Sequence, residues 1–280
     1  MVNICRFKIS KLKYKKTWKN IKHYYISNVL YFLIKKMIKI QDLKVWVWDK
    51  NILNWVSLCF KLWKNYCLLW KNWSGKSTLS SFLMWHPKYE YISWNIKIDQ
   101  ENLLNLDPEQ RSKAWLFLSF QNVPEIKWIR LSEYLRIIYN ISLKNSEVDI
   151  KELSPFIFKR FIKKYLNELS IDEKFLDREL NVWFSGWEKR KIEILQMKLI
   201  WPKYIILDEI DSGLDLDAFR TIAEMLKQLS SENNSLIIIT HYFTILDYID
   251  VDYVYVMKDW NIVEEWDRSL VEKIKEKGYE

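Results

Sequence analysis

The stretch Trp70-Lys71-Asn72-Trp73-Ser74-Gly75-Lys76-Ser77-Thr78 decides how this chain is interpreted. With glycine at 70 and 73 it would be a complete phosphate-binding loop, G-x-x-x-x-G-K-S. Such a loop needs glycine because its backbone adopts positive φ angles and approaches the phosphates closely at a helix N-terminus. An apolar run at 66–69 precedes it and a helical pattern at 77–84 follows. The sequence therefore predicts strand, phosphate-binding loop and helix.

Glycine is scarce in this chain and tryptophan is abundant. The chain holds four glycines and sixteen tryptophans in 280 residues. A usual glycine share of about 7% would give about twenty, which is the sum of the two counts. Our hypothesis is that the source organism reads UGA as glycine, whereas this chain was translated with UGA read as tryptophan. The alternative is a literal Trp-rich protein. In it, the indole of Trp73 would obstruct the phosphate-binding loop. Backbone strain would in addition cost about 1–3 kcal/mol at each such position.

The formal charge of +8 is concentrated at the N-terminus. Residues 1–36 hold ten Lys or Arg and no acid, so 34 basic and 36 acidic residues remain in 37–280. The main body is therefore not a nucleic-acid binder on charge grounds. Residues 1–36 are either upstream sequence before a true start at Met37 or a basic extension. The apolar run at 29–34 is too short to span a membrane.

Three cysteines, Cys5, Cys59 and Cys67, show no C-x-x-C spacing. We expect reduced thiols in a cytoplasmic protein, with no metal-ligand role. Continuous apolar strands alternate with amphipathic helices, which predicts an α/β domain with a buried parallel sheet over 37–280. The expected strands are 38–47, 52–60, 66–69, 114–120, 204–207 and 236–240. The expected helices are 77–84 and 216–229, with a helical insert at 129–178 that includes 155–169.

Acidic residues follow one of these strands directly. Asp208 could enter a Mg²⁺ shell and Glu209 could orient or deprotonate an attacking water, although a strand can also simply end in two solvated acids. Lys76 would reach the β- and γ-phosphates and Ser77 would ligate Mg²⁺. His241 follows the strand at 236–240, where it could contact the γ-phosphate, although a lone histidine is more often structural.

Taken together, these elements resemble the ABC ATPases. The resemblance covers 37–280 and adds three motifs: Gln121 at the Q-loop, the signature Phe184-Ser185-Gly186-Trp187-Glu188, and the D-loop Ser212-Gly213-Leu214-Asp215. It implies an α/β phosphate-loop fold with a mostly parallel central sheet, an N-terminal antiparallel β part and a helical subdomain at about 122–180.

The resemblance also implies roles for individual residues. The cofactors would be ATP and Mg²⁺, with Ser77, Gln121 and Asp208 on the metal and with Glu209, His241 and Gln121 in catalysis. An ATP-dependent homodimer would place each ATP between one chain's residues 70–78 and the partner's signature. Ser185, Gly186, Trp187 and Glu188, with Asp215 of the D-loop, would then complete the nucleotide site.

Within these ATPases, the chain is similar to the SufC family of the SUF iron–sulfur cluster assembly system. Four stretches carry this similarity: 85–90, 120–126, 181–197 and 240–249. The similarity implies a cytoplasmic ATPase that changes the conformation of SufB-like and SufD-like scaffold proteins without inserting into a membrane. The expected partner surface is 121–178, where Ile126 and Ile129 are either contacts or subdomain core. Alternatives are the ATPase subunit of a membrane transporter, or a nucleotide-dead interaction protein if the tryptophans are literal.

The family pattern also tests the glycine hypothesis. Twelve of the sixteen tryptophans fall where glycine is usual: Trp55, Trp63, Trp70, Trp73, Trp85, Trp94, Trp115, Trp128, Trp183, Trp187, Trp260 and Trp266. About one coincidence is expected by chance. The pattern does not decide the other four: Trp18, Trp46, Trp48 and Trp201.

Overall fold

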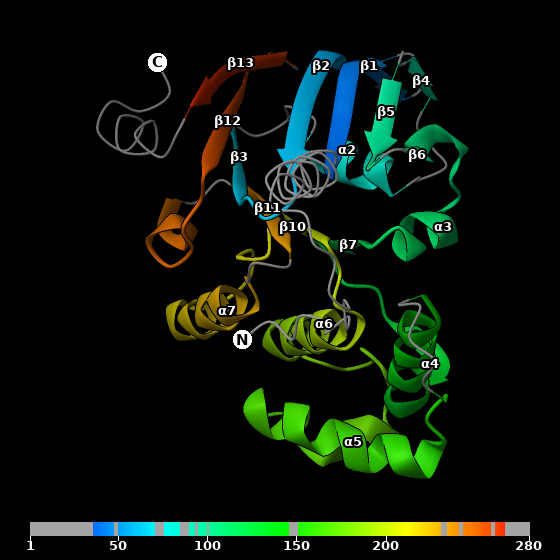
Figure 1. Ribbon diagram of the computed structural model, residues 1–280. Coiled ribbons are helices and arrows are strands. Elements are labelled where there is room, and N and C mark those ends of the chain that lie inside the picture. Colours follow the sequence, from blue (N-terminus) through cyan, green and yellow to red (C-terminus); the bar gives the residue numbers. More distant parts are fainter. Residues whose placement is uncertain are drawn as a thin grey trace, which may run out of the picture. The chain divides into compact units, whose positions relative to one another are not determined.

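The computed structural model describes residues 36–47, 50–70, 76–84, 90–92, 95–99, 101–145, 151–230, 234–240, 243–258 and 261–266. All the elements named below belong to one compact unit that begins at Met37. The architecture is α/β, with two large sheets, a short two-stranded sheet and a group of helices (Figure 1). The predicted fold class is confirmed.

The central sheet has six described strands in the order β13-β12-β3-β11-β10-β7. Neighbouring strands are parallel from β12 to β7, and only β13 pairs antiparallel, with β12. Every residue of β10 and β11 is buried, as expected for parallel strands covered on both faces. The bounds are β3 (Tyr66–Trp70), β7 (Leu116–Ser119), β10 (Tyr204–Asp208), β11 (Ser235–Thr240), β12 (Tyr253–Lys258) and β13 (Asn261–Trp266).

The second sheet is antiparallel and contains the N-terminal strands. Its order among the described residues is β2-β1-β5-β6, and β4 pairs separately with β1. The two predicted N-terminal strands are confirmed, and the three short strands are additions that the sequence pattern did not indicate. The bounds are β1 (Met37–Val47), β2 (Lys50–Lys61), β4 (Glu90–Ile92), β5 (Asn95–Ile98) and β6 (Glu101–Asn102).

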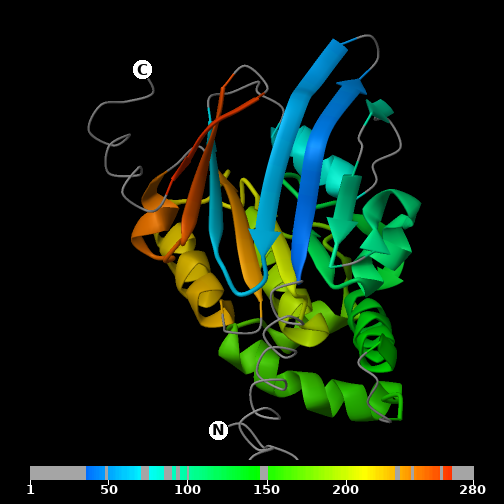
Figure 2. The same cartoon turned by 45° about the horizontal axis from the view of Figure 1, so that its top comes forward.

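Helices cover both faces of the central sheet. Figures 1 and 2 show α6 and α7 on the face turned away from β1 and β2. On the other face, α2 contacts both β10 and β2 and so fills the space between the two sheets. The bounds are α2 (Lys76–Leu83), η1 (Leu103–Asn105), α3 (Pro108–Lys113), α6 (Gly186–Ile200), α7 (Leu216–Leu229) and η3 (Phe243–Asp247).

The predicted helical insert consists of α4 (Leu131–Asn145), α5 (Pro155–Glu168) and η2 (Glu173–Asp177). Two short antiparallel strands, β8 (Ile126–Arg130) and β9 (Glu179–Leu180), lie at its entry and exit. Helix α4 contacts α6, and Figure 1 shows α5 beyond both, away from the central sheet.

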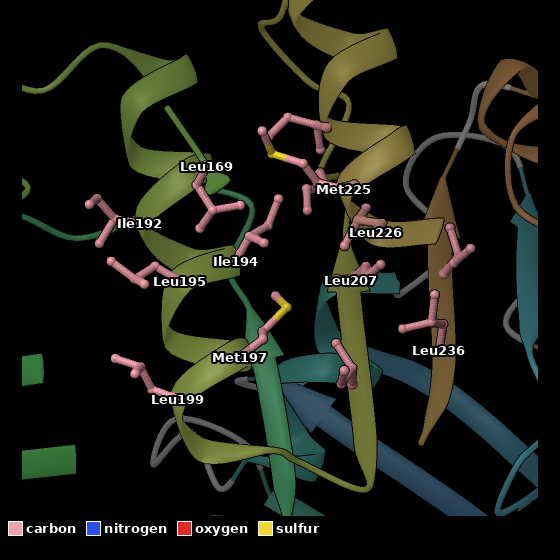
Figure 3. Packing of buried hydrophobic residues seen from close by; sticks show 14 of the residues in the cluster. Leu169, Ile192, Ile194, Leu195, Met197, Leu199, Leu207, Met225, Leu226 and Leu236 are labelled. Carbon is pink, nitrogen blue, oxygen red and sulfur yellow. The ribbon is translucent and has the colours of Figure 1, made fainter. Parts of the chain in front are cut away.

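The two faces of the central sheet carry two separate hydrophobic cores. Along β10, Ile205 and Leu207 belong to the core under α6 and α7, whereas Tyr204 and Ile206 face the antiparallel sheet. Figure 3 shows side chains of α6, α7 and β10 gathered in the first of these cores. Each fully buried aliphatic side chain contributes about 1.5–3 kcal/mol of transfer free energy. These cores fix the carboxyl ends of β3, β7, β10 and β11, where the candidate site residues lie.

Several tryptophans adopt a backbone conformation that favours glycine. Five of the twelve positions that match family glycines have positive φ: 56° at Trp55, 69° at Trp63, 69° at Trp115, 67° at Trp128 and 59° at Trp183. Positive φ is uncommon outside glycine and is an outlier for a bulky residue. Trp201, which the family pattern left undecided, has φ 45° and ψ 58° at the end of α6. A left-handed residue just after a helix is a common place for glycine.

The other tryptophan positions give less information. Trp187 lies inside α6 and therefore has a helical backbone. Trp46 lies within β1, paired with Asn51 and Glu90. Trp73, Trp85, Trp94 and Trp260 lie outside the described residues, as do Trp18 and Trp48.

Candidate active site

The two flanks of the predicted phosphate-binding loop are where the sequence placed them. Strand β3 ends at Trp70 and helix α2 begins at Lys76. Lys76 and Ser77 therefore form the first residues of α2, followed by Thr78. Residues 71–75, which comprise Lys71, Asn72, Trp73, Ser74 and Gly75, lie outside the described residues. The first N–H groups of a helix have no partner within the helix, and its N-terminus is the positive end of the helix dipole, so the start of α2 suits an anionic ligand.

Asp208 is fixed against the helix that follows this loop. It ends β10, is 3% exposed, and accepts a 2.6 Å hydrogen bond from the Ser80 hydroxyl of α2. A carboxylate this deeply buried at the carboxyl end of a parallel strand lies where α/β folds bind their ligands. The sequence predicted Asp208 but missed Ser80, which lies one helical turn beyond Ser77.

The donor set suits a magnesium ion. Asp208 offers a carboxylate, Ser77 is a hydroxyl residue at the start of the α2 helix, and Gln121 carries an amide oxygen. Mg²⁺ prefers oxygen ligands and commonly takes one or two carboxylates together with substrate phosphates. Among the described residues no cluster of three or more His, Cys, Asp or Glu could hold a metal by itself. The composition of the site therefore fits a nucleotide-bound Mg²⁺.

Glu209 and Gln121 contact each other directly. The Gln121 amide nitrogen donates to the Glu209 carboxylate at 2.5 Å, from the loop after β7 to the turn after β10. Glu209 is 8% exposed and has φ 50°, and its own N–H donates to the Ile239 carbonyl of β11 at 2.9 Å. The structure thus brings together two residues that the sequence placed in catalysis.

The signature residues form the N-terminus of α6. Ser185 caps the helix, because the Glu188 N–H donates to its hydroxyl at 3.2 Å and its own N–H donates to the Glu188 carboxylate at 2.7 Å. A Cβ added to Gly186 would lie 3.9 Å from the Gly213 carbonyl, so the signature adjoins the D-loop of the same chain. Trp187 packs half-buried against the α6–α7 core, with the Lys191 ammonium 4.6 Å from its ring centroid.

The other two predicted residues differ in what the structure shows. Asp215 caps α7, accepting from the Ala218 N–H at 2.8 Å, which is a structural role within this chain. His241 lies outside the described residues. The residue before it, Thr240, donates its hydroxyl to the Asp211 carboxylate at 2.6 Å. This bond ties the end of β11 to the turn that follows Glu209.

A cavity of about 380 Å³ opens between the loop after β7 and helix α4. Apolar side chains from this loop, from the start of β8 and from α4 line it, among them Phe120, Val123, Ile126, Ile138 and Ile141. Ile126 is 38% exposed and Ile129 is 39% exposed, so neither belongs to the subdomain core.

No helix in the described part of the chain is long and apolar enough to cross a membrane.

Relatives of this chain carry the name of an ATP-dependent protein. No family model matches the chain. The probable ATP-dependent transporter ycf16 of Cyanophora paradoxa is 41% identical over 245 residues, covering 88% of this chain and 94% of the relative. A Synechocystis protein, also named a probable ATP-dependent transporter, is 38% identical over 244 residues, which cover 87% of this chain and 94% of the relative. Among solved structures, a dimeric ATP-binding cassette with ADP and phosphate gives a TM-score of 0.66 at 18% identity. The match covers 82% of this chain and 98% of the cassette.

Proposed function

Because the chain belongs to the ycf16 family of ABC ATPases, we propose that its hydrolysis of ATP drives conformational change in a SufB/SufD-type scaffold during iron–sulfur cluster assembly. The family hydrolyses ATP to ADP and phosphate. The observation that carries the scaffold proposal is the SufC-like sequence, above all the unbroken block at 181–197 that leads from the signature into α6.

The hydrolytic roles follow from the positions described above. Lys76 and the N–H groups at the start of α2 would bind the phosphates. Asp208, Ser77 and Gln121 would hold Mg²⁺, which supplies positive charge against the phosphates when it is bound. Glu209 would orient or deprotonate the attacking water. In a head-to-tail homodimer, Ser185 and Gly186 of one chain would contact the partner's nucleotide, and the dimeric state named for the solved cassette supports this.

The apolar cavity between the Q-loop segment and α4 supports a partner surface at 121–178. Ile126 and Ile141 both line this cavity and are 38% and 43% exposed, and Ile137 on the same helix as Ile141 is 48% exposed. Exposed apolar groups around a cavity are typical of protein–protein interfaces. A scaffold helix or loop seated here would respond to movement of Gln121, which begins the same segment.

A second candidate function is the ATPase subunit of a membrane transporter. The names of the relatives favour it, because these proteins are called probable ATP-dependent transporters. The two functions share the nucleotide site and differ in the protein that occupies the cavity.

Copurification separates the two functions. We expect the tagged full chain to copurify with SufB-like and SufD-like proteins from detergent-free extract of its own cells, and its ATPase rate to rise in their presence. Ile141→Glu should abolish this association, whereas Tyr91→Glu should not, because Tyr91 is 42% exposed on β4, lies outside 121–178 and does not line the cavity. Copurification with an integral membrane protein instead would establish the transporter reading.

The glycine hypothesis bears on whether the nucleotide site is intact. We infer that Trp55, Trp63, Trp115, Trp128 and Trp183 are glycine in the native protein, and positive φ at all five supports this. The same reasoning adds Trp201. If the tryptophans at 70, 73 and 187 were literal, the chain would be a nucleotide-dead interaction protein.

A further inference from the structure

Arg190 joins three parts of the active site through a single buried guanidinium. It lies in α6 five residues after the cap Ser185 and is 3% exposed. One of its terminal nitrogens, Nη1, donates to the Phe120 carbonyl at 2.8 Å and to the Ser119 hydroxyl at 3.1 Å. The other, Nη2, donates to the Gln121 carbonyl at 3.1 Å and to the Glu209 carbonyl at 3.4 Å.

Glu193 holds this guanidinium in place from one turn further along α6. Its carboxylate accepts from Arg190 Nη1 at 2.7 Å and from the Ser119 hydroxyl at 2.9 Å. Both partners of the ion pair are about 4% exposed at their side chains. A buried pair of this kind is maintained only with good geometry and further hydrogen bonds, and here the additional bonds go to the ends of β7 and β10.

Two of the three carbonyls that Arg190 binds belong to Gln121 and Glu209, the residues whose side chains contact each other. Gln121 and Glu209 contact through their side chains at 2.5 Å, and Arg190 binds the backbone of each. Glu209 has a positive φ of 50°. A non-glycine residue keeps such a conformation only where its surroundings hold it. The planar guanidinium has five donors in a fixed arrangement, which a lysine cannot reproduce.

We propose that Arg190 is a positioning residue for ATP hydrolysis, which fixes the Q-loop and the turn carrying Glu209 relative to each other and to the signature helix. The inference rests on the proposed role of Glu209 and Gln121 in hydrolysis. Arg190 does not touch the reacting atoms. Its loss would let Glu209 and Gln121 move by fractions of an ångström, while nucleotide binding at the start of α2 would persist.

The test compares Arg190→Met with Arg111→Met in the full chain that carries the residues found in the native protein. Arg111 is a matched control, because it is 2% exposed and also donates to backbone carbonyls, those of Phe82, Leu83 and Leu106. We expect both variants to lose stability. Only Arg190→Met should lose kcat, by roughly 10- to 100-fold, with little change in KM for ATP.

Two further variants keep the proposal open to refutation. Arg190→Lys retains the charge and should fold, but it should recover only part of kcat. In a double-mutant cycle, Gln121→Ala should lower kcat less in the Arg190→Lys background than in the parent protein, because Arg190 acts through Gln121. Additive effects, an unchanged kcat in Arg190→Lys, or equal losses of kcat in both arginine variants would overturn the proposal.

The outcome is separable from that of the proposed function. If the parent chain hydrolyses ATP but does not bind the scaffold proteins, the scaffold proposal is wrong. The role of Arg190 is then still decided by the kcat values of its variants. A parent chain with no ATP hydrolysis would overturn both.

Discussion

The Ser80 hydroxyl lies 2.6 Å from the Asp208 carboxylate, joining residues that are 128 positions apart in the sequence. Both side chains are buried, with Ser80 at 0% and Asp208 at 3% exposure. This bond connects the helix after the predicted phosphate-binding loop to the strand that carries the predicted metal ligand. It therefore sets the orientation of the carboxylate before any ion arrives.

Ser80→Ala should weaken both the fold and the use of magnesium. A buried carboxylate that loses one donor costs about 1–3 kcal/mol, and Asp208 would then be oriented less well. We expect a lower midpoint in urea unfolding and a higher Mg²⁺ concentration at half-maximal ATPase activity. Ser142→Ala is the control, because the Ser142 hydroxyl donates to the Ile200 carbonyl at 3.0 Å, away from Asp208. An unchanged Mg²⁺ dependence in Ser80→Ala would contradict the orienting role.

Trp201→Gly should stabilise the protein, which is the opposite of what removing an aromatic residue usually does. A left-handed backbone costs an L-residue roughly 1–2 kcal/mol that glycine avoids. The indole is 52% exposed, and its ring centroid lies 6.1 Å from that of Tyr139, so little packing is lost. We expect a net gain of about 1 kcal/mol in the free energy of unfolding.

Trp46→Gly provides the matched comparison. Trp46 lies inside β1 and is partly buried, so glycine there should destabilise the strand. Equal destabilisation by both substitutions would show that the left-handed backbone of Trp201 carries no penalty. The contrast between the two tryptophans, measured by chemical unfolding, thus tests the glycine assignment without mass analysis.

The two described cysteines should differ in reactivity. Cys67 is fully buried in β3, and burial raises the pKa of its thiol above the ordinary value, whereas Cys59 on β2 is partly exposed. Because the thiolate is the reactive form, Cys67 should resist iodoacetamide in the folded protein while Cys59 is alkylated. Mass analysis of the digested product reads out both sites. Rapid labelling of Cys67 at neutral pH would contradict this.

The raised pKa of Cys67 also determines how the free energy of unfolding changes with pH. The unfolded Cys67 thiol loses its proton near its ordinary pKa, while the folded thiol keeps it. Above that pH the folded state therefore binds more protons than the unfolded state, and the free energy of unfolding should fall as pH rises. The effect should be absent in Cys67→Ala.

Sequence patterns predicted the long elements of this fold well. The helix expected at 216–229 is α7 with the same bounds, and the apolar runs before Asp208 and His241 are β10 and β11. Strands β4, β6 and β9 have two or three residues each, too few for any periodicity to show. The sequence pattern does not predict helix α6, because buried Arg190, Lys191 and Glu193 interrupt its apolar residues.

The sequence indicated residues for the candidate site, whereas the contacts between them came only from the structure. Asp208, Glu209 and Gln121 follow strands and matched family motifs. The contacts of Ser80 and Arg190 join segments that are distant in sequence, so no local pattern could indicate them. The family pattern also could not predict the left-handed backbone conformation of Trp201, because this conformation depends on where α6 ends.

The tryptic peptide 179–189 of the native protein tests the glycine hypothesis where it matters most. It carries position 183, which has φ 59° and whose side chain is 88% exposed, and position 187, which lies in the signature. We expect both masses to correspond to glycine, because the first position needs a left-handed backbone and the second must admit a nucleotide closely. Peptide 45–50 of the same digest, which carries position 46, should retain tryptophan there. If 183 and 187 are both tryptophan, the signature side of the nucleotide site is blocked by the indole, and the protein is a nucleotide-dead member of its family.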